Sequence, residues 1–597
     1  MEQTPSTSSF IEARRIDARR AGPARLSGAQ AVIQALVDVD VDMFFLCSGG
    51  ALIAPLCEAI SAHVGARVVR LSQERAAVHA AEGHAKATGR MAAVLVCGGP
   101  GIAAAVPGLM SALADSVPLL CIAGQVSSEL IGTDAFRECD ALGITRPVTK
   151  WNRRIAAVHE AAGIVERAAR VARDGRHGPV LVEVPIDVQR DVTPYQRIGH
   201  AAGGSHKSGG LPRLPPDRRL AHAASQIHAA RRPLLYAGGG LVRSGPHACA
   251  ALAEFVRFTD IPCALTMTAL GALPSGERSL LGWLGTGGSP VANLALLHAD
   301  LVVCVGARLD ERSRPPACAN DAPGGPAIPG ELVHVDIDPT SINKVCASAT
   351  PLVGDCAEVL KGVGRCLLQL PGFAAAADAP GRLDDWWAQI AQWRLQCAPD
   401  PAARAPIGEQ VLGALRDELA LRGAVVAVDD GVQQVAAAHQ LRHEHPGRWL
   451  VSGGAGMPGF ALPAAIGALA AQPQRPVVCL SDANALLPTL HELQSVADHG
   501  WPLKLVVFPS PVADLRRSTA ACGAAPAVMM QRPDVAAIAR AFGWRIHRLK
   551  SATGIERAVR ELLDCDEPYL LQVDPSLADP LRTGTAAEPL PALAHQR

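Results

Sequence analysis

Short apolar runs rich in Val, Ile and Leu recur along most of the chain, and they constrain its fold more than any other feature. Each run ends on small or polar residues and precedes an Ala-rich stretch; examples are MAAVLVCGG (91–99), RPLLYAGGG (232–240) and RPVVCLSDA (475–483). Runs of this kind that alternate with helical stretches are typical of buried parallel strands joined by crossover helices. The sequence therefore predicts an α/β fold built on doubly wound parallel sheets.

The length of the chain and two breaks in this alternation predict how it divides. A chain of 597 residues exceeds what one hydrophobic core serves, and about 150 residues per domain suggests three or four units, of which we take three. Linker-like stretches at 197–217 and 370–382 are rich in Gly, Pro and Ala. We therefore expect domains at 27–195, 216–371 and 383–575, with a disordered leader at 1–26 and a tail at 576–597.

Composition excludes several classes of function. Basic and acidic residues balance at 56 each, so the chain carries no basic footprint for nucleic acid. The chain has no apolar stretch of the roughly 18 residues that a membrane span needs, and its start lacks the apolar core of a signal peptide. The 16 cysteines are scattered without a C-x-x-C pair, which favours buried thiols. We expect a cytoplasmic protein without a nucleic-acid or membrane partner.

Glycine-rich turns and one carboxylate are the candidate functional features. Gly-rich turns at 98–101, 238–240 and 452–468 follow predicted strands, where phosphates can approach helix N-termini. Each turn alone is a weak signal, and YAGGGLVRSG lacks the G-x-G-x-x-G spacing of a nicotinamide site. Glu74 ends an apolar run and opens an Ala-rich helix. A carboxylate there is also ordinary, because the helix dipole favours negative charge at its N-terminus.

Taken together, the motifs resemble the thiamine-diphosphate (TPP) enzymes of the acetolactate synthase large-subunit type. The resemblance covers roughly residues 27 to 575 and rests on motifs in each predicted domain: QERAAVHAAEGHAKATGR (73–90), LGWLGTGG (281–288), GARLDER (306–312), VHVDIDPTSINK (333–344), WLVSGGAGMPGFALPAAIGALA (449–470) and HELQSVADHGWPLKLVV (491–507). It implies a pyrimidine-binding domain, a central FAD-type domain and a diphosphate-binding domain. It also implies a homodimer or homotetramer, because the family's cofactor lies between two chains, and a possible regulatory small subunit.

The resemblance also implies roles for individual residues. Glu74 matches the Glu that hydrogen-bonds the aminopyrimidine ring of TPP, Gln125 and Phe136 match residues that line the active site, and Arg312 matches an Arg associated with the carboxylate of the second keto acid. The other implied TPP-binding residues are Gly99, Gly101, Gln434, Gly454, Gly456 and Met457. The implied flavin-binding residues are Gly239, Gly240, Arg308, Asp336 and Asp338. For the two Asp residues, a structural role in a strand-end turn or helix cap stands equally open.

The diphosphate site departs from the family pattern. The family ends one strand with a G-D-G-[SA] turn and the next with N-N, and that Asp and the second Asn bind Mg²⁺. Here the aligned turn is Asp482-Ala483-Asn484-Ala485, and Ser510 stands at the second Asn. A slip of one residue would make Asp482 the aligned Asp. The candidate metal ligands are therefore Asp482, Asn484 and Ser510, although Mg²⁺ prefers carboxylate, phosphate and water oxygens that this turn supplies poorly.

Two functions remain open at this point. The first is a TPP-dependent transferase or lyase with FAD and Mg²⁺, a carboligase or decarboxylase acting on pyruvate or a related 2-keto acid in branched-chain amino acid biosynthesis. The second is a non-catalytic homologue that has lost Mg²⁺–TPP binding and serves as a flavin-binding, regulatory or scaffold protein.

Overall fold

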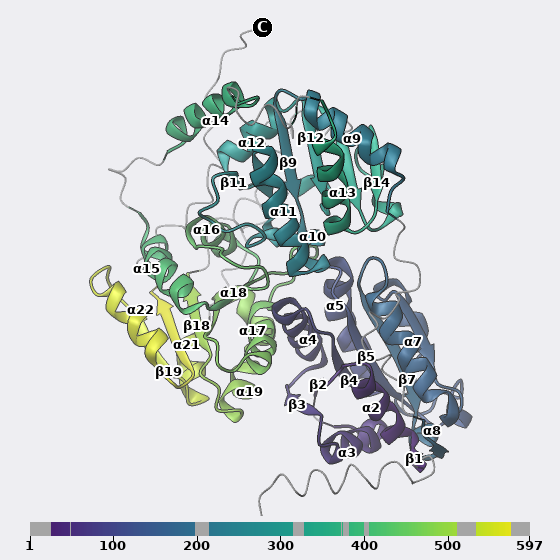
Figure 1. The fold of residues 1–597 in the computed structure, drawn as a ribbon. Helices are drawn as coiled ribbons and strands as arrows, with labels where there is room; N and C mark the ends of the chain where they lie inside the picture. Colours follow the sequence, from purple (N-terminus) through teal and green to yellow (C-terminus); the bar gives the residue numbers. More distant parts are fainter. Residues whose placement is uncertain are drawn as a thin grey trace, which may run out of the picture.

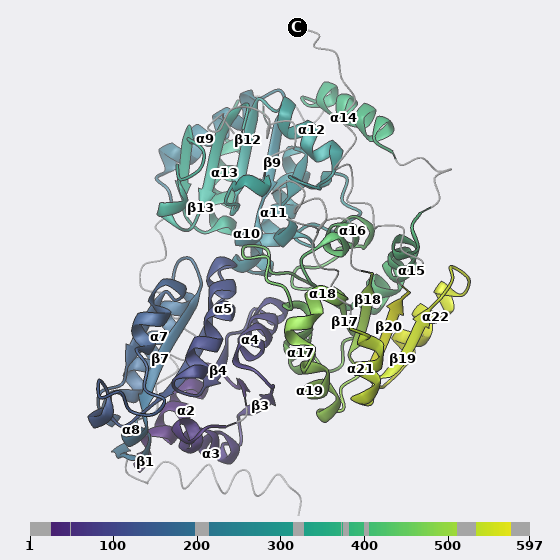
Figure 2. The same cartoon turned by 180° about the vertical axis from the view of Figure 1, so that it is seen from behind.

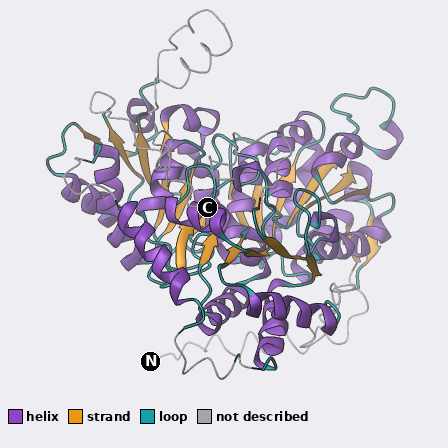
Figure 3. Ribbon diagram, turned by 90° about the horizontal axis from the view of Figure 1, so that it is seen from above, coloured by secondary structure: helices purple, strands orange, loops and turns teal. Residues whose placement is uncertain are grey.

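The computed structural model describes residues 25–47, 49–196, 214–313, 328–371, 373, 381–398, 405–509 and 533–574. Within these residues the chain forms three six-stranded sheets, one in each of three successive segments, and every strand pair within the three sheets is parallel. Helices flank each sheet (Figure 3). The α/β prediction is therefore confirmed, with three parallel-sheet layers in one chain (Figure 1).

The first sheet has the strand order β3-β2-β4-β5-β7-β6. Its strands are β2 (Met43–Leu46), β3 (Arg67–Arg70), β4 (Ala92–Val96), β5 (Leu119–Gln125), β6 (Trp151–Arg154) and β7 (Pro179–Pro185). Its helices are α2 (Gly28–Asp38), α3 (Ala54–Ala62), α4 (Glu74–Thr88), α5 (Pro100–Ala114), α6 (Ala141–Thr145), α7 (Ala161–Arg173) and α8 (Ile186–Arg190). A small antiparallel pair, β1 (Arg25–Ser27) with β8 (Val192–Pro194), joins the two ends of this domain. Strand β1 begins inside the predicted leader, and residues 1–24 lie outside the described residues.

The central sheet has the order β11-β10-β9-β12-β13-β14. Its strands are β9 (Pro233–Ala237), β10 (Cys263–Leu265), β11 (Leu280–Trp283), β12 (Leu301–Val305), β13 (Glu331–Asp336) and β14 (Thr350–Val353). Its helices are α9 (Asp217–Ala229), α10 (Gly239–Ser244), α11 (Pro246–Thr259), α12 (Pro290–His298) and α13 (Cys356–Leu368). Helix α14 (Asp384–Gln396) also packs here, because the indole N–H groups of Trp386 and Trp387 donate to the carbonyls of Pro233 and Asp260.

The third sheet has the order β16-β15-β17-β18-β20-β19. Its strands are β15 (Val425–Val428), β16 (Trp449–Leu450), β17 (Val477–Asp482), β18 (Lys504–Phe508), β19 (Arg545–Leu549) and β20 (Tyr569–Val573). Its helices are α15 (Ile407–Arg422), α16 (Val432–Gln440), α17 (Ala461–Ala471), α18 (Ala483–Leu486), α19 (Glu492–Asp498), α21 (Val535–Ala541) and α22 (Ile555–Asp564). The predicted tail from 576 onward lies outside the described residues.

Helices α4 and α17 join the first and third domains. Figures 1 and 2 show them side by side between the two sheets, and their apolar residues share one core. The contact needs glycine: a Cβ on Gly467 would lie 1.8 Å from the carbonyl oxygen of Ala80, and a Cβ on Gly83 would lie 2.2 Å from that of Ala464. This packing holds the start of α4, where Glu74 lies, close to the third domain.

No helix among the described residues is both long and apolar enough to cross a membrane. The fourteen described cysteines are all free thiols, and half of them are buried. Burial raises the pKa of the Cys121 thiol to about 12, so this residue behaves as a small apolar side chain.

Candidate active site and cofactor pocket

A cavity of about 590 Å³ lies where the three domains meet. Turns at the carboxyl ends of β9, β12 and β13 form its floor, including Gly239, Gly240 and Gly306. The first domain contributes Lys86 and Asp115 to its wall, and the third domain contributes residues from α16 and the 451–454 turn. Carboxyl ends of parallel strands are the usual ligand-binding edge of such sheets. The cavity volume lies in the range of small-molecule and cofactor sites.

The glycine turns let backbone form the floor of the cavity. A Cβ on Gly239 would lie 2.7 Å from Oγ1 of Thr268, and a Cβ on Gly240 would lie 2.8 Å from the carbonyl oxygen of Gly306. The two strand-end turns are therefore in direct contact, and the N–H of Gly240 donates to the carbonyl of Gly306 at 2.9 Å. Glycine permits this close approach of the two backbones. Both glycines implied by the resemblance lie at the cavity.

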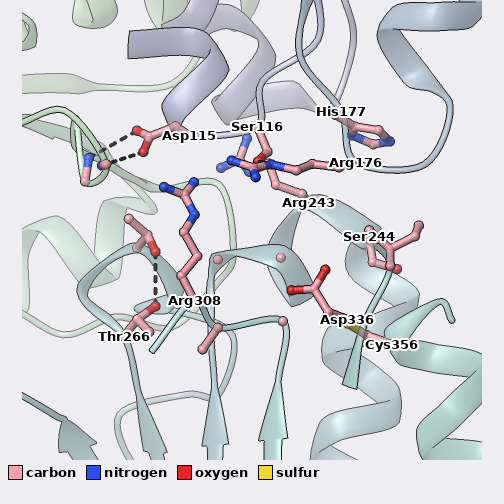
Figure 4. Close-up of a pocket in the computed structure, with 18 of the residues that line it drawn as sticks. Asp115, Ser116, Arg176, His177, Arg243, Ser244, Thr266, Arg308, Asp336 and Cys356 are labelled. Atoms are coloured by element: carbon pink, nitrogen blue, oxygen red, sulfur yellow. Dashed lines mark hydrogen bonds between the residues drawn. The ribbon is translucent and has the colours of Figure 1, made fainter. Parts of the chain in front are cut away.

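Arginine side chains gather at one part of this cavity. Figure 4 shows Arg176, Arg243 and Arg308 below Asp115 and Ser116, with Asp336 facing them. Burial lowers the pKa of the Arg308 guanidinium, as does the charge of Arg176, whereas Asp115 acts in the opposite direction. Burial likewise lowers the pKa of Arg243. Several guanidinium groups in one cavity favour an anionic ligand with oxygen acceptors, such as a diphosphate.

Asp336 and Asp338 have different surroundings. Asp336 lines the cavity, and burial raises the pKa of its carboxyl group above the usual range. Asp338 instead caps the short helix η8 (Pro339–Ser341) by accepting from the N–H of Thr340 at 2.9 Å, and it lies 3.8 Å from Nη1 of Arg176. The structural alternative thus describes contacts of both residues, because Oδ1 of Asp336 accepts from the N–H of Asp338 at 2.8 Å in the turn after β13. Asp336 in addition lines the cavity.

Gln434 and Arg312 mark the side of the cavity toward the third domain. Gln434 is buried, lines the cavity, and its Nε2 has no hydrogen-bond partner within the described part of the chain. Arg312 is half exposed, and its Nη2 lies 3.9 Å from Oδ1 of Asp430. A buried amide donor without a partner is costly unless a ligand accepts its hydrogen bond. Gln434 therefore points to an acceptor group in this cavity.

Glu74 is the first residue of α4 and is partly buried at the edge of the first sheet. A Cβ on Gly101 would lie 3.0 Å from its Oε1. Gly99, with φ of +69°, is the N-cap residue of the neighbouring helix α5. The structure thus places the Glu74 carboxylate against Gly101, at the start of helix α5 and two residues after Gly99.

Gln125 and Phe136 have different surroundings. Gln125 is fully buried, and its Nε2 donates to Oε1 of Glu183 at 2.7 Å and to the carbonyl of Cys139 at 2.9 Å. Its own Oε1 accepts from the N–H of Val126. Phe136 is 86% exposed, with the Arg137 guanidinium 5.3 Å from its ring centroid.

The glycine turn after β16 is occupied by an interdomain carboxylate. Asp115 accepts from the N–H groups of Gly453 at 3.1 Å and Gly454 at 2.6 Å, and Nζ of Lys86 lies 2.6 Å from its Oδ2. Gly456 and Met457 bond back to Ser452 within the turn. The sequence indicates a phosphate-binding turn here, and in the described structure the amides of Gly453 and Gly454 join two domains.

Asp482 acts as a helix cap. Its carboxylate accepts from the N–H groups of Asn484 at 2.8 Å and Ala485 at 3.3 Å. Behind it, Asp429 is fully buried and accepts from Oγ of Ser481; burial, with a contribution from the charge of Asp482, raises the pKa of Asp429 to about 7. These contacts place two carboxyl groups at the edge where a diphosphate would bind.

This turn does not fit the Mg²⁺ site of the family. The aligned position holds Ala483, and Ser510 lies outside the described residues. Among the residues that the structure describes, no group of three His, Cys, Asp or Glu side chains could hold a metal ion. Because Mg²⁺ is bound through carboxylate and phosphate oxygens, the donor set seen here is too small and Asp482 is already used as a cap.

Several residues at these sites were not found from the sequence. Lys86, Asp115, Arg176 and Arg243 line the cavity, and Glu492 contacts the turn before Glu74. Lys86 and Glu492 lie in stretches that carry the resemblance, but they also contact segments hundreds of residues away in the chain. A pattern in one segment gives no sign of such a partner.

Fold and site together define a three-domain α/β protein with a cofactor cavity at the carboxyl ends of parallel strands. Family models match each domain: Thiamine pyrophosphate enzyme, N-terminal TPP binding domain, at residues 26–144; central domain, at 220–363; and C-terminal TPP binding domain, at 429–573. The chain belongs to the thiamine pyrophosphate enzyme family.

Relatives narrow the group within the family. The acetolactate synthase isozyme 3 large subunit of Escherichia coli (strain K12) is 34% identical over 81% of this chain and 82% of its own. The acetolactate synthase large subunit of Haemophilus influenzae matches to the same extent, at 34% identity over 81% and 82%. The probable acetolactate synthase large subunit of Methanococcus aeolicus is 30% identical over 93% of both chains. The resemblance to acetolactate synthase large subunits is confirmed.

Proposed function

We propose that this protein is an acetolactate synthase-like enzyme that uses TPP to decarboxylate pyruvate or a related 2-keto acid and join the remaining fragment to an acceptor. When bound, TPP supplies the nucleophilic carbon that adds to the keto group. The observation that carries the proposal is Glu74 at the first turn of α4, opposite Gly101. Its carboxylate would hold a proton at the aminopyrimidine ring, and Gly101 leaves room for that carboxylate.

Arg312 is the candidate for binding the keto-acid carboxylate. Its guanidinium is half exposed at the cavity rim and only loosely paired with Asp430, so it can take up a bidentate carboxylate partner. Gln125 and Phe136 are proposed to line the substrate side. The engaged amide of Gln125 supports a role in shaping the site, and exposed Phe136 is available to a second chain.

Product analysis tests the proposed reaction. We would incubate the full chain with ¹³C-labelled pyruvate, TPP, FAD and Mg²⁺ and identify products by NMR. Labelled acetolactate supports the carboligase, and a labelled aldehyde without coupling supports a simple decarboxylase. Neither product, in protein that has bound flavin, would favour the non-catalytic homologue.

We propose FAD as the ligand of the 590 Å³ cavity. The glycine turns and the guanidinium groups suit a dinucleotide with a diphosphate. Gly239, Gly240, Arg308 and Asp336 would contact it, and Asp338 would support Arg176.

Replacing Arg308 by Ala should weaken FAD binding about tenfold, because it removes one charge-assisted hydrogen-bond donor from the cavity. The affinity is read from the quenching of flavin fluorescence during titration. Arg257→Ala is the matched control, since Arg257 is exposed and pairs with Glu277 away from the cavity. Equal affinities in all three proteins would rule out Arg308 as a contact.

The remaining proposals concern assembly and pathway. The relatives are named large subunits, which supports a smaller regulatory partner for this chain and a place in branched-chain amino acid biosynthesis. We propose a homodimer or homotetramer in the cytoplasm. Binding of Mg²⁺ as a cofactor would require ligands outside the described turn.

A further inference from the structure

One face of helix α19 binds the turn that precedes Glu74. Glu492, Ser495 and His499 follow one another at spacings of three and four residues, so they share one side of the helix. All three contact the segment between β3 and α4 in the first domain, residues 70–73. The contact therefore runs from the third domain to the element that carries the proposed catalytic carboxylate.

Glu492 makes the strongest of these contacts. Its side chain is 0% exposed, and its carboxylate accepts from the N–H of Ser72 at 3.1 Å and of Gln73 at 3.2 Å. Oγ of Ser495 donates to its Oε2 at 2.5 Å. A buried carboxylate that accepts from several donors keeps its position, because moving away from a donor would leave its charge uncompensated and would cost free energy.

The two other residues extend the contact along the turn. Oγ of Ser495 lies 3.3 Å from Oγ of Ser72, and Nε2 of His499 lies 3.3 Å from the carbonyl oxygen of Arg70. On the other side, the N–H of Leu71 donates to the carbonyl of Leu46 in the first sheet at 2.9 Å. The turn is thus fixed between its own sheet and α19.

The start of α4 has no side-chain cap of its own. Gln73 is the N-cap residue and makes no side-chain cap hydrogen bond, whereas its own N–H donates to Glu492 of another domain. An N-cap side chain normally fixes the entry of a helix. Here that entry, and with it the direction of Glu74 one residue later, depends on a residue more than four hundred positions away in the chain.

We propose that Glu492 is a positioning residue for Glu74. Its carboxylate accepts from the two backbone N–H groups immediately before Glu74. It thereby sets the direction of the Glu74 carboxylate, which lies opposite Gly101. Helix α19 follows the Asp482–Leu486 turn by only a few residues. This inference rests on the proposed function, because it assigns Glu492 a part in the chemistry of Glu74.

Two variants and a control test the inference in the full chain. Glu492→Ala removes the acceptor, and Glu492→Gln keeps one acceptor oxygen in nearly the same shape. Gln494→Ala is the matched control, because Gln494 lies on α19 and bonds only to Asp498 of the same helix among the hydrogen bonds described. Hydrogen exchange of the cofactor-free protein should show the amides of Ser72 and Gln73 exchanging about tenfold faster in Glu492→Ala, since each loses its acceptor.

Measurement of kcat and KM distinguishes a positioning role of Glu492 from a purely structural one. We expect Glu492→Gln to lower kcat about tenfold, with KM and TPP affinity nearly unchanged, because a small displacement of a catalytic group slows chemistry without weakening binding. Unchanged kcat in a folded Glu492→Gln, or unchanged exchange of Ser72 and Gln73 in Glu492→Ala, would overturn the inference. If Glu492→Ala fails to fold, Glu492→Gln decides. A wild-type chain without TPP-dependent turnover would instead defeat the proposed function, and this inference with it.

Discussion

Replacing Glu74 by Gln should slow the exchange of the thiazolium C2 proton of bound TPP about hundredfold, at the lower end of general acid–base effects. The amide has nearly the same shape as the carboxylate, but it cannot share a proton with the aminopyrimidine ring. Stability should change little, because Glu74 begins α4 and is only partly buried, so the substitution loses about 0.3–1 kcal/mol of helix-dipole interaction. Quenched-flow deuterium exchange read by NMR measures the rate, and thermal unfolding measures the stability.

Glu58→Gln is the control for this experiment. Glu58 lies on α3 and is exposed, so its replacement removes the same charge from the same domain without changing Glu74 or Gly101. Exchange in Glu58→Gln should match the unmodified protein. If Glu74→Gln also exchanged at the unmodified rate, the carboxylate would have no part in activating the cofactor.

The second large effect is expected at the diphosphate turn. Asp482→Gly combined with Ala483→Asp should strengthen Mg²⁺-dependent TPP binding about hundredfold. Removing the Asp482 carboxylate frees the N–H groups of Asn484 and Ala485, and the new Asp supplies the missing ligand. Hydrogen bonds to charged groups are worth roughly 1.5 to 3 kcal/mol each, and a tenfold change in affinity needs about 1.4 kcal/mol. Titration calorimetry with and without millimolar Mg²⁺ measures the gain.

The neutral pair Asp482→Gly with Ala483→Asn tests the reason for that gain. It opens the turn in the same way but adds no charge, so it should recover only the part of the affinity that is independent of Mg²⁺. Tight, Mg²⁺-dependent binding by the unmodified protein would contradict our description of the turn. Asp482 would then be a metal ligand in the bound state, as the alignment slipped by one residue allows.

The sheets could be predicted because their signal is local. Runs such as 91–99 and 232–240 carry their burial pattern within the strand itself, and the strand-end glycines followed directly from them. Glu74 could be placed at a helix start for the same reason. The predicted boundary at 383 places α14 in the third domain, whereas its tryptophans donate hydrogen bonds to Pro233 and Asp260 of the central domain. No local sequence pattern indicates those partners.

The contacts within the sites could not be predicted, because they depend on where distant segments meet. Asp115 is not among the candidate residues from the sequence, yet it contacts Lys86 and the amide of Gly454. Asp482 could be read as a ligand or as a cap, and the contacts of its carboxylate identify a cap. Glu492 lies in a quoted motif, but its partner Ser72 is 420 residues away. A family resemblance assigns roles to individual residues, but their hydrogen-bond partners are seen only in the folded structure.

The central claim is that this chain is a TPP-dependent enzyme acting on a 2-keto acid. The most direct test measures CO₂ release from pyruvate by the full chain as TPP is added at fixed FAD and Mg²⁺, beside Glu74→Gln and beside the Asp482→Gly, Ala483→Asp protein. We predict release that rises with TPP in the unmodified chain, saturates at lower TPP in the double variant, and falls about hundredfold in Glu74→Gln. No TPP-dependent release from either the unmodified chain or the double variant, in protein that has bound FAD, would contradict the account.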